Sequence, residues 1–148
     1  MPDKPKIPHR FPMLFVDRIV EATPERALGE KYVTVNEPYF RGHFPQAPVM
    51  PGVLVMESLF QLVWSNWGGE DGFRLCGIRK LKFRRSVLPG DIMQLEALPL
   101  NLEQQPFKFR CTARVEDKIA VEGELWVVRR PAKNPQHSLN EQREPVKA

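Results

Sequence analysis

Six stretches of this chain combine β-branched and aromatic residues with intervening polar positions, and turn residues separate them. Such patterns predict β-strands, here over residues 14–23, 26–35, 73–85, 91–103, 107–117 and 118–128. Between the second and third lies a stretch that is apolar almost throughout, residues 51–67, which predicts one helix buried on most sides. Two strands, a helix and four strands, without βαβ repeats, predict an α+β domain whose helix packs on one antiparallel sheet.

Turn-forming residues set the ends of these elements. Pro51 suits the first helical position, and Gly68 and Gly69 suit the stop. The segment "LPGD", Leu88–Asp91, places proline and glycine for a tight turn, and "EDK", Glu116–Lys118, predicts a hairpin. One sheet around one helix leaves a sheet edge and apolar surface uncovered, so we predict a dimer that buries both.

The composition is that of a soluble globular protein, with 148 residues, 42% hydrophobic and 27% charged. This length fits one domain, residues 1–130, followed by a polar segment, residues 131–148, predicted to be a disordered tail in which His137 has no role. No run approaches the roughly 18 apolar residues that span a bilayer, and the N-terminus lacks an apolar signal core. Cys76 and Cys111 lie in predicted strands without metal-ligand spacing, which predicts reduced core thiols in a cytoplasmic protein.

The densest basic run is "RKLKFRR", Arg79–Arg85, in a chain of net charge +4. Strand alternation predicts that Leu81 and Phe83 point inward, with the outward positions taken by Lys80, Lys82 and Arg84. This face is either an ordinary solvated strand surface or a landing patch for an acidic partner. Nucleic acid is not supported, because no stacking aromatics interleave on the outward face.

The loop before the helix, "GHFPQAPVMPG", has proline at every third position, 45, 48 and 51. This spacing predicts a stiff, extended, polyproline-like path. His43 stands at its entrance, and histidine titrates near neutrality. The histidine is either structural or an acid-base group that the stiff arm holds in place. A PxxP ligand for a partner's aromatic groove is a weaker alternative, since this segment is apolar.

The helix start lacks a side-chain cap, because Met50 precedes Pro51 where Ser, Thr, Asp or Asn would be needed. The first-turn amides of Gly52, Val53 and Leu54 therefore have no obvious side-chain acceptor. Either a water or neighbouring carbonyl satisfies them, or they and the helix dipole stabilise a developing oxyanion.

Glu57 is the one carboxylate in the apolar helix, with Val53 and Phe60 among its helical neighbours. A carboxylate on such a face must be paired or protonated. It is therefore either a structural partner of an arginine or a general acid. Gln61, one turn on, can donate a hydrogen bond to it and set its orientation.

The segment "GHFPQAPVMPGVLVMESLFQ", residues 42–61, resembles the signature of the 3-hydroxyacyl-[acyl carrier protein] dehydratases of the FabA/FabZ hotdog family. The resemblance extends over residues 8–128 through "PHRFPMLFVDRI", "VTVNEPYFRGHFP" and "IRKLKFRRSVLPGD". It implies a hotdog fold, an antiparallel β-sheet wrapped around one long central helix, and a homodimer or a trimer of dimers.

The same resemblance implies a reaction, the elimination of water from a (3R)-3-hydroxyacyl thioester to give the trans-2-enoyl thioester, in fatty acid or related polyketide and polyene biosynthesis. His43 of one subunit and Glu57 of the partner subunit would be catalytic, with thioester-binding amides at Gly52 and Val53. The Val49 carbonyl would orient the histidine ring. Glutamate at position 57 is similar to the FabZ branch, which dehydrates without isomerising the double bond.

The resemblance implies no metal and no redox cofactor, because the substrate arrives on the phosphopantetheine arm of acyl carrier protein. That acidic protein is a fitting partner for a basic docking patch at Lys80, Lys82, Arg84 and Arg85. The sequence departs from the family pattern at Gln46, where glycine is usual, and at Phe60 and Trp64, which stand where small alanines are usual. We expect these two aromatic residues to shorten or bend the acyl tunnel. A hotdog thioesterase and a non-catalytic acyl-thioester-binding subunit are the alternative functions.

Overall fold

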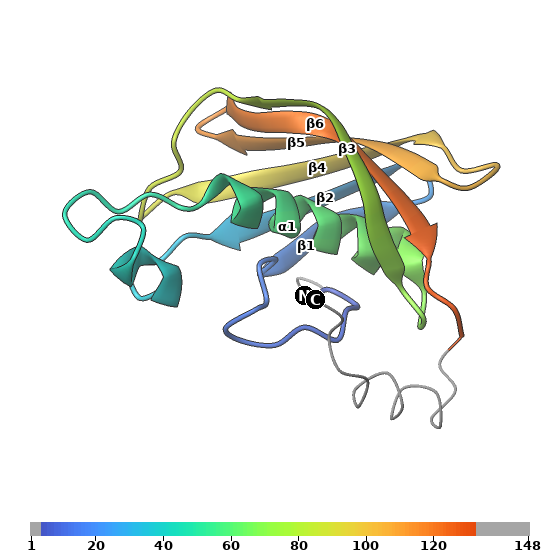
Figure 1. Cartoon of the computed structure of the whole chain (residues 1–148), viewed down its shortest axis with the longest axis horizontal. Helices are drawn as coiled ribbons and strands as arrows, with labels where there is room; N and C mark the ends of the chain where they lie inside the picture. Colours follow the sequence, from blue (N-terminus) through green and yellow to red (C-terminus); the bar gives the residue numbers. More distant parts are fainter. Residues whose placement is uncertain (1–3, 133–148) are drawn as a thin grey trace, which may run out of the picture.

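The computed structural model describes residues 4–132, and Figure 1 shows one antiparallel sheet curving around a single long helix. The helix is α1 (Gly52–Val63). The sheet order is β1-β2-β4-β5-β6-β3, with every neighbouring pair antiparallel. Its strands are β1 (Arg18–Thr23), β2 (Arg26–Tyr32), β3 (Phe73–Phe83), β4 (Ile92–Asn101), β5 (Phe107–Val115) and β6 (Lys118–Arg129). The predicted α+β hotdog architecture is confirmed.

Both predicted tight turns form. In the segment before β4, the Asp91 amide donates to the Leu88 carbonyl over 3.1 Å, and Gly90 supplies the positive φ of 95°. Between β5 and β6, Glu116 and Asp117 take φ values of 50° and 63°, as a two-residue hairpin turn of the I′ type requires. These local signals place four of the six strands correctly.

The helix differs from its prediction at both ends. Pro51 is the residue before the first helical turn, because its ψ of 135° is extended, and helical geometry begins at Gly52. After Val63 the chain widens into a π-helical turn, η2 (Trp64–Gly68), in place of a single helix to Trp67. The Asn66 side chain in that turn donates to the Thr23 carbonyl over 2.8 Å, so a contact with the β1–β2 hairpin holds the wider turn.

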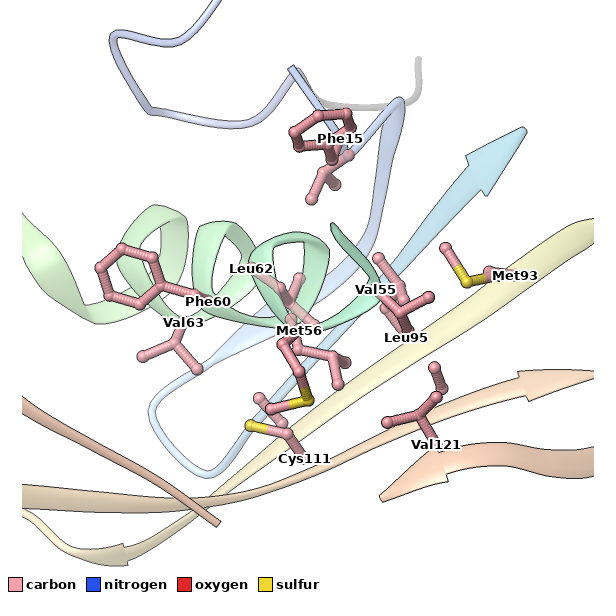
Figure 2. Packing of buried hydrophobic residues seen from close by; sticks show 14 of the residues in the cluster. Phe15, Val55, Met56, Phe60, Leu62, Val63, Met93, Leu95, Cys111 and Val121 are labelled. Atoms are coloured by element: carbon pink, nitrogen blue, oxygen red, sulfur yellow. The ribbon is translucent and has the colours of Figure 1, made fainter. Parts of the chain in front are cut away.

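The core lies between α1 and the sheet. Figure 2 shows Met56 of α1 directed toward Cys111 of β5, while Phe15 lies on the opposite side of the helix. Phe15, Met56 and Cys111 are all buried. The N-terminal segment therefore covers the helix face that the sheet leaves open.

One expectation for β3 is wrong: Cys76 is not a core thiol. It is exposed, because Phe73 and Leu75 take the inward positions and strand alternation turns the next residue outward. Only Cys111 is a core thiol. Phe83 points inward as expected, since it pairs with the buried Val121 and its ring lies over Gly52. It is nevertheless 56% exposed, because it lines an open cavity at the start of α1.

No helix within residues 4–132 is long and apolar enough to cross a membrane. The last described strand, β6, ends at Arg129. Most of the predicted tail, residues 133–148 with His137, lies outside the described residues.

Candidate active site

The loop that carries His43 is closed by two reciprocal hydrogen bonds with Val49. The Val49 amide donates to the His43 carbonyl over 2.9 Å, and the Val49 carbonyl lies 2.9 Å from Nδ1 of the imidazole. Between them, the Ala47 amide donates to the Phe44 carbonyl over 3.1 Å, with Pro45 in the turn. The expectation of a continuous extended path is wrong here, because the fixed φ of this proline suits the second position of a β-turn.

The Val49 contact determines the chemistry of the histidine ring. A carbonyl oxygen only accepts, so the neutral ring carries its proton on Nδ1 and leaves Nε2 with a free lone pair. The ring also stacks on Phe44, with centroids 4.4 Å apart and planes 23° from parallel. His43 thus has a fixed orientation and one nitrogen able to take a proton.

The start of α1 has no side-chain cap, as predicted. The Leu54 amide, expected to lack an acceptor, instead donates to the Pro51 carbonyl over 2.9 Å. The amides of Gly52 and Val53 have no hydrogen-bond acceptor within residues 4–132. Two amide donors at the positive end of the helix dipole can therefore bind an oxyanion.

A cavity of about 470 Å³ brings these groups together. Its lining includes His43 from the loop, Gly52 and Val53 from the helix start, and Phe83 from the end of β3. Phe83 closes over the glycine: a Cβ added at Gly52 would lie 2.5 Å from the aromatic ring. Arg85, from the predicted basic patch, also lines the cavity. The site therefore combines an imidazole, two free amides and a cation.

Glu57 lies outside that cavity, on the side of α1 that the N-terminal segment covers. Its Oε1 accepts a hydrogen bond from Nε2 of Gln61 over 3.1 Å. Gln61 is itself fixed, because its Nε2 donates to the Met13 carbonyl and its Oε1 accepts from the Phe15 amide, both over 2.8 Å. No arginine of the described chain lies within ion-pair distance of Glu57. The alternative of a structural arginine pair is therefore unsupported.

Sequence reasoning missed one neighbour of this carboxylate. His9 Nε2 lies 3.8 Å from Glu57 Oε1. The only signal was its place in "PHRFPMLFVDRI", a segment that matched the family but lies far from Glu57 along the chain. Within residues 4–132, no three His, Cys, Asp or Glu side chains gather in a way that could hold a metal ion.

Residues 7–124 match the sequence model of the FabA-like domain. The chain belongs to the FabA-like family. It is 39% identical over 132 residues to the 3-hydroxyacyl-[acyl-carrier-protein] dehydratase FabZ of Psychrobacter arcticus, covering 83% of this chain and 90% of that protein. It is 44% identical over 126 residues to the enzyme of the same name from Acetivibrio thermocellus, covering 80% and 86%.

Solved structures agree on the fold. A chain of the dehydratase heterocomplex ApeI:P from Xenorhabdus doucetiae superposes with a TM-score of 0.72 at 16% identity, covering 95% of this chain and 98% of that one. The uncharacterised protein PH1136 from Pyrococcus horikoshii gives 0.65 at 12% identity, covering 92% and 98%.

The two aromatic residues predicted to limit the acyl tunnel, Phe60 and Trp64, do not line the His43 cavity. Phe60 and Trp64 are 8% and 5% exposed and pack edge to face, with ring centroids 6.1 Å apart. Trp64 also contacts the His9 ring, at 5.2 Å between centroids. Both therefore belong to the Glu57 side of the helix.

The predicted basic patch is divided by ion pairs. Lys80 Nζ lies 3.4 Å from Glu124, and Arg84 lies 2.8 Å from Glu122, whose pKa the Arg84 hydrogen bond holds below its usual range. Lys82 and Arg85 have no carboxylate partner within residues 4–132. Arg84 and Arg85 line the His43 cavity, whereas Lys80 and Lys82 line a neighbouring groove over β6. Of the two uncompensated cations, Arg85 therefore lies at the cavity and Lys82 in the groove.

Proposed function

We propose that this FabA-like chain dehydrates (3R)-3-hydroxyacyl thioesters of acyl carrier protein to trans-2-enoyl thioesters. The observation that carries the proposal is the shared cavity in which the His43 ring faces the uncapped start of α1. The FabZ relatives, about 40% identical over most of their length, support the same reaction. Dehydration in fatty acid biosynthesis is the function that this chemistry fits best.

A second copy of the chain would complete the site. Within one chain, His43 and Glu57 belong to different surroundings, the first to the cavity and the second to the N-terminal segment. Val53, which shares a helix face with Glu57, is 73% exposed, and Phe44 is 56% exposed. These apolar surfaces beside a base support a homodimer, or a trimer of dimers, in which His43 faces Glu57 of the partner subunit.

The proposed reaction uses His43, the two free amides at the start of α1, and Glu57 of the partner subunit. The thioester carbonyl accepts hydrogen bonds from the Gly52 and Val53 amides, and His43 Nε2 removes the proton from C2. The electron pair of that bond moves to the carbonyl oxygen as an enolate, which the amides and helix dipole stabilise. When the enolate collapses, C2 and C3 form their double bond and the C3–O bond breaks. Glu57 protonates the departing hydroxyl, and water leaves.

The acyl carrier protein is proposed to dock on the basic patch. Lys82 and Arg85 are the contributors with free charge, because Lys80 and Arg84 are partly neutralised by Glu124 and Glu122. An acidic partner would be steered to the cavity rim by these cations, and salt would weaken the attraction. The free thiols of Cys76 and Cys111 fit a reducing, cytoplasmic setting for this partnership.

The acyl tunnel is proposed to end against Phe60 and Trp64. Both rings are buried beside Glu57, so an acyl chain that passes this carboxylate meets their bulk. We expect a preference for short or bent acyl chains, whether from fatty acid or polyketide metabolism.

The decisive experiment incubates the purified protein with a panel of 3-hydroxyacyl-carrier proteins and follows their mass. Dehydration removes the mass of one water from the acyl group, and the panel reports the chain length that is preferred. Release of free carrier thiol without loss of water would instead indicate the hotdog thioesterase. Binding without either change would indicate a non-catalytic subunit.

A further inference from the structure

The two oxygens of Glu57 differ in their surroundings. Oε1 accepts the hydrogen bond from Gln61 at 3.1 Å and faces Nε2 of His9 at 3.8 Å. Oε2 has no hydrogen-bond or ion-pair partner within residues 4–132. The Glu57 side chain is 30% exposed, so this second oxygen is the one available to a bound molecule.

The His9 ring is held in a fixed orientation. It packs edge to face on Trp64, with centroids 5.2 Å apart and planes at 87°, and its side chain is 21% exposed. Its Nδ1 is buried and has no hydrogen-bond partner among residues 4–132. A buried N–H without an acceptor is costly, whereas a bare ring nitrogen costs less, so the neutral ring carries its proton on Nε2. This nitrogen lies 3.8 Å from Oε1 of Glu57, beyond hydrogen-bond distance but near enough to reach it after a small shift.

The backbone around His9 is tied to the helix that carries Glu57. The Lys6 amide donates to Ser65 Oγ over 2.9 Å, and Gln61 binds both the Met13 carbonyl and the Phe15 amide. Contacts before and after His9 therefore fix the segment on the face of α1 opposite the sheet, where Figure 2 shows Phe15.

We infer that His9 is a positioning residue for the proposed dehydration: its Nε2–H, 3.8 Å from Oε1 of Glu57, closes to a hydrogen bond as charge forms there. Together with the Gln61 hydrogen bond, this assigns the transferable proton to Oε2. In the reaction, the Oε2–H bond breaks, the proton passes to the departing C3 hydroxyl, and Glu57 is left as a carboxylate. The negative charge that develops is then shared with Oε1, where Gln61 already donates and His9 Nε2 lies 3.8 Å away. Hydrogen bonds of this kind tighten as the charge forms. This inference rests on the proposed function.

The test compares three substitutions at one position. The amide nitrogen of Gln reaches the place of the imidazole Nε2, that of Asn reaches the place of Nδ1, and Phe keeps the aromatic packing on Trp64 without any donor. We expect His9→Gln to retain most of the wild-type kcat. We expect His9→Asn and His9→Phe to lower kcat by about 10- to 100-fold with little change in KM, since His9 does not touch the substrate.

Melting temperatures of all three variants accompany the kinetics, measured with a 3-hydroxyacyl-carrier protein. A wild-type kcat in His9→Phe or His9→Asn would overturn the inference, and so would an equal loss in His9→Gln and His9→Phe. If His9→Phe does not fold, the Gln and Asn variants decide between the two outcomes, because neither keeps the ring. Failure of the wild-type protein to dehydrate any substrate would instead refute the proposed function itself.

Discussion

The Val49 carbonyl lies 2.9 Å from Nδ1 of His43, and the Val49 amide donates back to the His43 carbonyl. A single residue thus closes the loop and sets the tautomer of its histidine. The free Nε2 faces a cavity whose other wall is the uncapped start of α1. This relationship makes His43 the proposed base and leads to the first prediction.

His43→Ala and Glu57→Gln should each lower dehydration by about 10²–10⁴-fold, the usual contribution of a positioned acid or base. Hydration of an enoyl thioester, the reverse reaction, gives a convenient optical assay. His137→Ala serves as the matched control, since no role is assigned to that histidine.

Mixing the two inactive variants tests whether the site is shared between subunits. A heterodimer of His43→Ala and Glu57→Gln chains holds one site with both wild-type residues. Random assortment should restore roughly a quarter of the wild-type activity. No recovery in verified heterodimers would contradict a shared site.

Gly52→Ala should lower kcat by about 10²–10³-fold, the typical loss for a disturbed oxyanion donor. The new methyl group would meet Phe83 at 2.5 Å and crowd the approach to the amide. The fold should survive, because Phe83 is 56% exposed and free to move. Steady-state kinetics and a thermal melt check both points.

The double variant Gly52→Ala, Phe83→Ala separates the two consequences of the methyl group. If the methyl group lowers kcat by crowding the Gly52 amide, removing the Phe83 ring should restore little of the kcat. Full recovery in the double variant would show that displacement of Phe83 alone was responsible.

Lys31→Met should lower the free energy of unfolding by about 3–5 kcal/mol, because it leaves the buried carboxylate of Glu37 without its positive partner. Lys31 is 3% exposed, and its Nζ lies 2.6 Å from Glu37 and 3.4 Å from Asp17. Urea unfolding measures the change. Lys31→Met with Glu37→Gln should recover part of the stability, and equal values for the single and double variants would contradict the argument.

Lys82→Glu, outside the His43 cavity, should raise KM for carrier-bound substrates and leave kcat nearly unchanged. Charge reversal repels an acidic carrier, and the effect should shrink as salt is added. Thioesters of short pantetheine analogues, which lack the carrier, should be turned over as by the wild type. Lys4→Glu, at an exposed N-terminal position, is the control; an equal rise in its KM would indicate a general charge effect.

Patterns that act over a few residues were enough to predict most of the fold. The strands, the buried helix and the turns at Leu88–Asp91 and Glu116–Lys118 depend on local backbone preferences and on period-two burial, so neighbours along the chain specify them. His43, Gly52 and Glu57 were identified from a contiguous motif for the same reason. Their roles remain proposals, but their positions in one segment required no tertiary information.

Only the tertiary structure decided where register, orientation and distant contacts matter. Phe83 points inward as its strand pattern predicts, but it stays exposed because β3 and the start of α1 leave an open cavity there, which a single strand's pattern does not contain. The contact between His9 and Glu57 joins residues far apart in sequence across the helix face opposite the sheet. Local sequence determined which chemical groups this protein carries, and packing between distant segments determined which of their atoms are free to react.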